Sequence, residues 1–311
     1  MKGSLPHPIR RVLFRALLAL VVCVAVARLA WLVLLSPKSP SREDRLPSPN
    51  GYDDFVAAGQ SLTRSGFIPS TATLEQMREY VSSNTAALSR LRLGLTHSAR
   101  VPIEFTPDYI DRWHNVLSST KGLAVLLRTE AKVFEADQRA DDALKSDLDA
   151  LRFSQESVRG GLFLDMLVGM NCEAIALGSL ERVLASLDPP QCRRAIQVIQ
   201  DVERSREPTA EILARERAWS RRVMGWRGAI LRIMPGHAQS LRQAEQKAAA
   251  KRDRVDRQRG AVLIKLAGRA FKLEAGKGPG RWEDLVPRYL EKIPTDPSTG
   301  QPLPLDLVTG D

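Results

Sequence analysis

Carboxylate and amide side chains lie inside the most apolar stretch of this 311-residue chain. Asp165, Asn171 and Glu173 fall within residues 162–187, which are otherwise apolar nearly all round and predict a buried central helix. A buried carboxylate has to be paired, or its pKa moves toward the neutral form. The acids near Asp165 therefore have two interpretations: a functional pocket in an enzyme of unknown type, or structural partners for arginine.

The other side chains that commonly do chemistry form no recognisable pattern. The glycine-rich stretch 276–280 follows a predicted helix rather than a strand, and Pro279 lacks the donor that a phosphate cradle needs. None of the histidines pairs at helical spacing with a second metal-type ligand in a known motif; they are His7, His97, His114 and His237. The sequence therefore predicts no catalytic, cofactor-binding or metal-binding residue, and it names no small-molecule ligand.

Positive charge is concentrated in one part of the chain. The net charge is +10, and residues 201–270 alone hold 17 basic and 8 acidic residues. Within them, residues 242–259 predict a charged helix with seven basic and three acidic residues. One interpretation is a solvated helix with internal pairs, such as Asp253 with Arg257 or Asp256 with Arg259. The other is an anionic partner: lipid headgroups, another subunit or nucleic acid, although the lack of interleaved aromatic residues argues against nucleic acid.

Three cysteines bear on the arrangement of the helices. Cys23 lies in an N-terminal apolar run, whereas Cys172 and Cys192 flank residues 188–190, a predicted Asp-Pro-Pro turn between two helices. In a helical hairpin Cys172 would lie roughly 24 Å from that turn, while Cys192 adjoins it. A disulfide needs Cα atoms within about 7 Å of each other. We therefore expect two free, buried thiols, although a location outside the cytoplasm would permit a bridge.

The N-terminal segment predicts a membrane anchor. Residues 12–35 form an apolar run long enough to cross a bilayer, and Arg15 and Arg28 lie toward its ends, where they can reach the headgroups. The small residues at 25–27 could mark a cleaved signal peptide, but the apolar run continues beyond them, so a signal anchor fits better. The basic, acid-free residues 1–11 favour a cytoplasmic N-terminus with the bulk of the chain in the periplasm.

The rest of the chain predicts an all-α fold. Aromatic residues are sparse while Ala, Leu and Arg are plentiful, a composition that favours helices. Residues 36–49 contain four prolines and four serines and predict an extended linker. Residues 50–236 predict a multi-helix body, either a bundle or an irregular α-solenoid. Residues 237–311 predict one long helix followed by a proline-rich segment.

Capping residues, glycines and prolines predict the helix boundaries within this body. A helix capped by Thr71 or Thr73 is expected to run to about Leu93, and a long helix is expected from Ala238 to Ala275. The other predicted boundaries are Thr106-Pro107-Asp108, Gly160-Gly161, Pro189-Pro190, Pro235-Gly236 and Gly276.

The last fifty residues have a distinctive pattern. A short helical turn at 282–286 precedes prolines and Asp-Pro turns that fix an extended path. The segment resembles the C-terminal part of the major pseudopilins of type II secretion, which folds back onto the preceding helix. The residues that carry the resemblance are Leu285, Val286, Pro287, Tyr289, Leu290, Pro294, Asp296, Pro297 and Gly300. It implies that the tail packs on the last helix, although the N-terminus lacks that family's prepilin cleavage sequence and early glutamate.

The whole layout also resembles a group of uncharacterised bacterial single-pass membrane proteins with a helical body. The likeness rests on the Asn-Gly-Tyr-Asp-Asp run at 50–54 and on the pattern G-G-x-x-x-D-x-L-x-G at 160–169. This resemblance implies a shared fold and no particular activity.

These features predict a membrane-anchored cell-envelope protein whose helical body binds an unknown protein partner or organises the envelope, without catalytic activity. Two alternatives remain open. One is a pseudopilin-related secretion-system subunit, and the other is an enzyme that uses the acids near Asp165.

Overall fold

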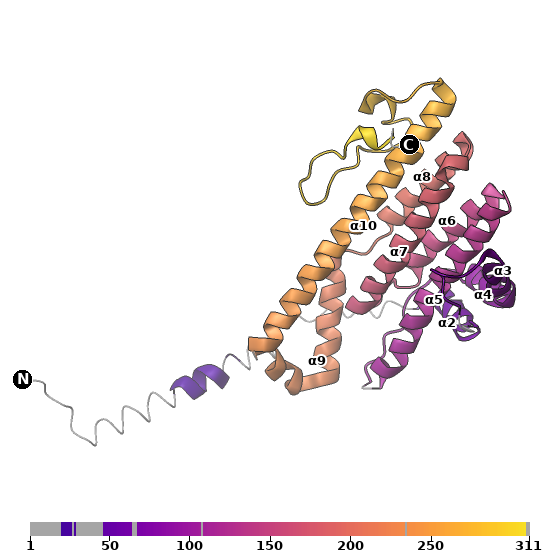
Figure 1. Ribbon diagram of the computed structural model, residues 1–311. Helices are drawn as coiled ribbons and strands as arrows, with labels where there is room; N and C mark the ends of the chain where they lie inside the picture. Colours follow the sequence, from indigo (N-terminus) through magenta and orange to yellow (C-terminus); the bar gives the residue numbers. More distant parts are fainter. Residues whose placement is uncertain are drawn as a thin grey trace, which may run out of the picture. The chain divides into compact units, whose positions relative to one another are not determined.

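The computed structural model describes residues 20–26, 28, 46–63, 67–106, 108–233 and 235–308. Within these ranges the chain folds as helices and contains no strand, apart from one isolated antiparallel bridge between Thr295 and Pro302. The predicted all-α fold class is therefore confirmed (Figure 1). The predicted N-terminal tail 1–11 lies outside the described residues, as do most of the predicted span 12–35 and most of the linker 36–49.

The chain divides into two compact units. The larger unit contains Arg45–Leu213 and Gln243–Asp311, and the smaller contains Met1–Asp44 and Ala214–Arg242. Helices α9 (Thr209–Ile233) and α10 (Pro235–Ala275) each contribute residues to both units.

Three short helices begin the larger unit: α2 (Gly51–Gln60), α3 (Leu74–Ser83) and α4 (Thr85–Gly94). Thr73 caps α3 in a capping box with Gln76, as its hydroxyl type predicts. The prediction of a single helix up to Leu93 is wrong, because the helix is interrupted at Asn84. The buried Asn84 side chain bonds the backbone of residue 63 instead, which competes with helix continuation.

Four longer helices form the middle of the larger unit and lie side by side in Figure 1: α5 (Tyr109–Ala136), α6 (Ala140–Glu156), α7 (Phe163–Val183) and α8 (Pro189–Arg204). Helix α7 packs against both α5 and α6, and α6 also contacts α8. A left-handed glycine, Gly160 (φ 74°), makes the turn before α7. Asp188 caps α8 in a box with Gln191, so this helix begins at the prolines that the sequence marks as a boundary.

Helix α7, with the 3₁₀ turn that follows it, is the element that the sequence predicts as the buried centre. Residues Phe163–Ser186 are long and apolar enough to cross a membrane, and among the described residues no other helix meets that test. Half of the most apolar part of this segment is buried inside the protein. Its side chains pack with those of α5 and α6, so we interpret α7 as the core helix of the body.

Helix α10 begins at Pro235, not at Ala238 as expected, because proline needs no backbone donor in a first helical turn. It ends at Ala275, and Gly276 follows with a left-handed φ of 73°, as predicted for a C-cap glycine. Its second half lies along α7, where the Lys265 ammonium pairs with Glu181 and the Arg269 guanidinium donates to the Leu187 carbonyl at 2.7 Å.

The C-terminal tail folds back onto α10 (Figure 1). Short 3₁₀ turns at Trp282–Asp284 and Leu305–Val308 are its only helical parts among the described residues. Leu285 and Leu290 are buried in the same apolar cluster as Leu263 and Leu266 of α10.

Candidate functional site

The buried glutamate of α7, Glu173, is paired with two arginines. Its side chain has no exposed surface. One oxygen accepts from Arg259 of α10, with Nε at 2.8 Å and Nη2 at 2.7 Å, and the other accepts from Arg206, just beyond α8. The Gln155 amide of α6 also donates to Glu173 at 3.3 Å. The expectation that a buried acid of this helix pairs with arginine is correct for Glu173.

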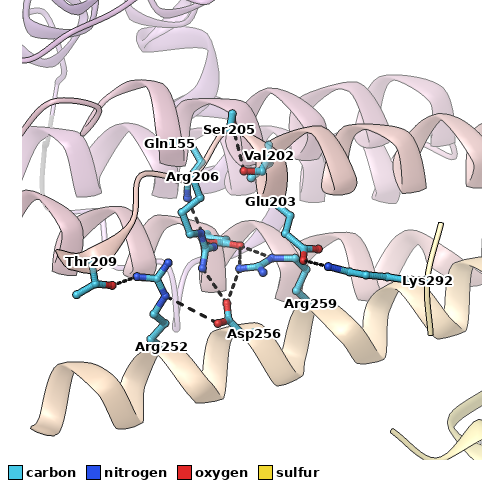
Figure 2. Close-up of polar contacts among 11 residues, drawn as sticks. Gln155, Val202, Glu203, Ser205, Arg206, Thr209, Arg252, Asp256, Arg259 and Lys292 are labelled. Carbon is cyan, nitrogen blue, oxygen red and sulfur yellow. Dashed lines mark hydrogen bonds and ion pairs between the residues drawn. The ribbon is translucent and has the colours of Figure 1, made fainter. Parts of the chain in front are cut away.

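Asp256 of α10 completes this cluster. Its Oδ1 accepts from Arg206 at 2.7 Å and from Arg259 at 2.8 Å, so each arginine contacts both acids. Figure 2 shows Arg206, Arg259 and Asp256 converging between the helices, with Arg252 beside them donating to Thr209. We call Glu173, Arg206, Asp256 and Arg259 the arginine–acid cluster. It joins α7, α10 and the α8–α9 connection through charge-assisted bonds.

The electrostatics of the cluster are those of a fixed ion-pair network. Burial lowers the pKa of Arg206, against the opposing effect of Glu173. Burial also lowers the pKa of Arg259, but Glu173 and Asp256 together raise it above its ordinary value. Guanidinium groups stay charged in proteins. This arrangement can position three segments of the chain rigidly.

Two hollows flank the cluster. The first is about 30 Å³ and holds little more than a water molecule; Met166, Met170 and Ile212 give it apolar walls beside Arg206 and Arg252. The second is a pocket of about 380 Å³ between α8, α10 and the tail. We call this second hollow the tail pocket.

The tail pocket is lined by balanced charge. Three acids and three bases contribute to it: Glu203, Asp256, Glu291, Arg204, Arg259 and Lys292. The rim is held by ion pairs between α8 and the tail, one of which joins Lys292 to Glu203 at 2.9 Å (Figure 2). A second pair joins Arg204 to Glu291. The lining therefore favours neither anionic nor cationic ligands.

Asp165, the acid that the sequence singled out first, lies in the first turn of α7. It is buried, its Oδ1 accepts from the Trp113 indole at 2.8 Å, and its Oδ2 accepts from the Leu162 backbone N–H at 2.6 Å. These two bonds connect Asp165 to α5 and to the first turn of α7. Asp165 lines neither hollow, and its bonds give it a structural role at the start of the core helix.

The basic stretch 242–259 is mostly exposed up to residue 250, and it differs from a solvated helix from residue 251 onward. The predicted pair of Asp256 with Arg259 is present, but Arg259 is only 5% exposed. Lys251 donates to Asn171 Oδ1 at 2.5 Å, and Arg257 binds Asp296 of the tail at 2.9 Å. The cations of this stretch from residue 251 onward therefore include several that hold the body together.

Asp147 of α6 is a buried acid that the sequence analysis missed. Among the described residues, neither of its carboxylate oxygens has a hydrogen-bond partner. Burial raises its pKa from 3.8 to about 7, while Ser179 and Arg182 of α7 lower it and Glu135 of α5 raises it. A signal was present, because Asp147 lies at helical spacing on the apolar face of residues 144, 148 and 151.

A second buried network also escaped the sequence analysis. Arg92 of α4 donates to Asp149 of α6 at 2.9 Å and to Glu130 of α5 at 3.1 Å, and the Ser146 hydroxyl donates to the same glutamate at 2.6 Å. Both acids are buried. The arginine partner lies in a short helix whose packing no local pattern predicts.

Cys172 and Cys192 are free and buried, as predicted from their distance along the expected hairpin. No family model, no curated protein and no solved structure matches this chain. Its function therefore has to be inferred from its own residues.

Proposed function

We propose that this protein is a membrane-anchored helical module that acts by binding other proteins of the cell envelope. The observation that carries the proposal is the exposed apolar helix near the N-terminus. Residues 20–26 and 28 are helical, and Leu20, Val22 and Val26 are 60%, 54% and 59% exposed. Aliphatic side chains of the body core, such as Leu177 and Leu180, have no exposed surface.

An exposed apolar helix is costly in water and stable in lipid. Burial of apolar surface stabilises by about 25 cal/mol per Å², so a run of aliphatic side chains strongly favours a bilayer. The described residues fall in the middle of the apolar segment 12–35, which has the length of a single span. A signal anchor with a cytoplasmic N-terminus and a periplasmic body agrees with the basic residues before it.

A binding role agrees with the way in which the body is built. The arginine–acid cluster and the Arg92 network fix five helices relative to one another through buried, charge-assisted bonds. Such networks favour one arrangement of the helices, and therefore of the surface that the helices form, rather than a chemical reaction. A rigid surface lowers the entropic cost of binding a partner.

The anchor and its orientation are tested together. A reporter that is active only outside the cytoplasm is fused after Asp311, and membranes are washed with alkaline carbonate. We expect reporter activity, together with retention of the intact chain in the membrane pellet. A soluble chain would refute the anchor, and an inactive reporter on a retained chain would refute the periplasmic location.

A second candidate function, a pseudopilin-related secretion subunit, is favoured by one observation. The tail packs against α10, where Tyr289 lies edge-on to Phe271, and the resemblance found in the sequence implies packing of this kind. Co-purification with secretion-system components from the native membrane would support this candidate. Purification of the intact chain without any of them would exclude it in favour of an independent envelope module.

A further inference from the structure

Within the smaller unit, the segment Ala214–Arg242 holds an unusual excess of positive charge. It contains seven arginines and a single acid, Glu216, so its net charge is +6 of the chain's +10. The segment comprises most of α9, a break in that helix at Gly225 (φ 53°), and the first turns of α10. No stretch of the larger unit that the sequence analysis singled out carries so one-sided a charge.

The contrast with the neighbouring basic stretch is informative. There Arg259 binds Glu173 and Arg257 binds Asp296, so part of the positive charge serves contacts within the larger unit. The sequence of Ala214–Arg242 contains one carboxylate and seven guanidinium groups, so its own charge is strongly positive. Charge of this kind is complementary to an anionic surface.

Apolar residues accompany the arginines. Arg222 and Met224 are both exposed in α9, and Leu241 is exposed near the start of α10. Trp219 of the same segment is buried, so among the described residues the large apolar side chains exposed there are Met224 and Leu241. Helices that lie in a membrane interface combine basic residues, which meet phosphate groups, with Trp, Leu or Met that enter the acyl boundary.

We infer that Ala214–Arg242 binds the anionic lipid headgroups of the membrane in which the protein is anchored. The inference rests on the proposed anchor, which keeps the folded chain near a bilayer. The linker 36–49 can extend roughly 50 Å at most, so the local concentration of headgroups around the segment is high. Each guanidinium near a negative surface adds to the attraction, and salt screens it.

The test compares two lipids with the full-length protein. The chain is reconstituted into vesicles of phosphatidylcholine alone or of phosphatidylcholine mixed with phosphatidylglycerol, and amide hydrogen exchange is followed peptide by peptide. We expect exchange in Ala214–Arg242 to be roughly tenfold slower with the anionic lipid, and the difference to vanish at about 1 M salt. Equal exchange in the two lipids would overturn the inference, and it is the result expected if the segment serves an acidic protein instead.

Matched variants assign the effect to this segment. R217E/R222E reverses two exposed arginines of α9 and should abolish the lipid-dependent slowing. K277E/R281E makes the same change of charge in an exposed loop of the tail and should leave the slowing unchanged. A slowing that survives R217E/R222E would place the lipid contact elsewhere and overturn the inference.

Failure of the anchor can be recognised separately. Carbonate extraction of the same vesicles reports the anchor, whereas hydrogen exchange reports the segment. A chain that is extracted yet protected by added anionic vesicles would refute the anchor and support the lipid contact. A chain that is retained in the membrane but exchanges equally in both lipids would support the anchor and refute the lipid contact.

Discussion

Asp147 differs from the other buried acids described above because its oxygens have no hydrogen-bond partner among the described residues. An ionised carboxylate without partners is costly in a core, so the neutral acid is favoured there. This is the cause of the rise in its pKa from 3.8 to about 7. The group therefore titrates in the folded protein near physiological pH.

The raised pKa has a definite consequence for stability. Between about pH 4 and pH 7 the folded protein holds a proton on Asp147 that the unfolded chain has lost. The stability that this group contributes is fully present below its unfolded pKa, and it is lost as the pH rises through about 7.

Asp147→Asn should remove this pH dependence. We expect the variant to gain roughly 2 kcal/mol relative to wild type between about pH 5 and pH 8, because the neutral amide avoids the buried charge. Urea unfolding in detergent at both pH values measures the difference. Asp149→Asn, two residues later, is the control and should destabilise the fold because it removes a partner of Arg92. A constant difference between Asp147→Asn and wild type across this range would contradict the assignment.

At the scale of the helices, the arginine–acid cluster is the main polar contact of α7 with α10. Glu173→Gln leaves two buried guanidinium groups with one acid instead of two. We expect a loss of about 3–5 kcal/mol, as for a broken buried pair. Thermal unfolding followed by circular dichroism measures it.

Glu203→Gln is the matched control for that change. Glu203 pairs with Lys292 at the rim of the tail pocket, and the lysine side chain is 74% exposed, so the loss should stay below about 1 kcal/mol. Equal melting of Glu173→Gln and Glu203→Gln would mean that the cluster does not hold α7 to α10.

The helices themselves were largely predictable from the sequence, because their signals are local. Thr73 and Asp188 mark helix starts through their own side chains, and Gly276 marks an end through its backbone. The break at Asn84 was missed because its partner, residue 63, lies outside the periodic run. When a capping-type residue lies inside an apolar helical pattern, the sequence does not reveal whether the helix continues or breaks there.

For the candidate site, the sequence predicts the type of contact but not the residues that make it. Burial of Glu173 follows from the apolar helix around it, and the need for an arginine follows from the cost of a buried charge. The identity of that arginine does not follow, because Arg259 is 86 residues away and many arginines compete for the role. Asp165 shows the same limit, since its partner Trp113 lies 52 residues away in the sequence.

For the molecule as a whole, the tail closes the core that α10 would otherwise expose. At Gly260 a Cβ atom would lie 2.6 Å from Leu303, so the glycine permits the tail to approach the helix. Arg257 and Asp296 pair across the same contact, and the bonds from Arg257 and Ser298 lower the pKa of that aspartate well below its usual range. The tail therefore combines apolar burial with an ion pair that persists at acidic pH.

Truncation after Gly276 should therefore expose Leu263 and Leu266 of α10 and cause aggregation of the detergent-solubilised protein, measured by size-exclusion chromatography. Leu290→Ala tests the same contact in the complete chain. Leu290 is 1% exposed, so its loss should cost about 2–5 kcal/mol, whereas Leu273→Ala at a half-exposed position of α10 should cost under about 0.5 kcal/mol. If the truncated protein stays monodisperse and Leu290→Ala melts with wild type, the tail is an appendage, and α10 must obtain its stability from α7 and α8 alone.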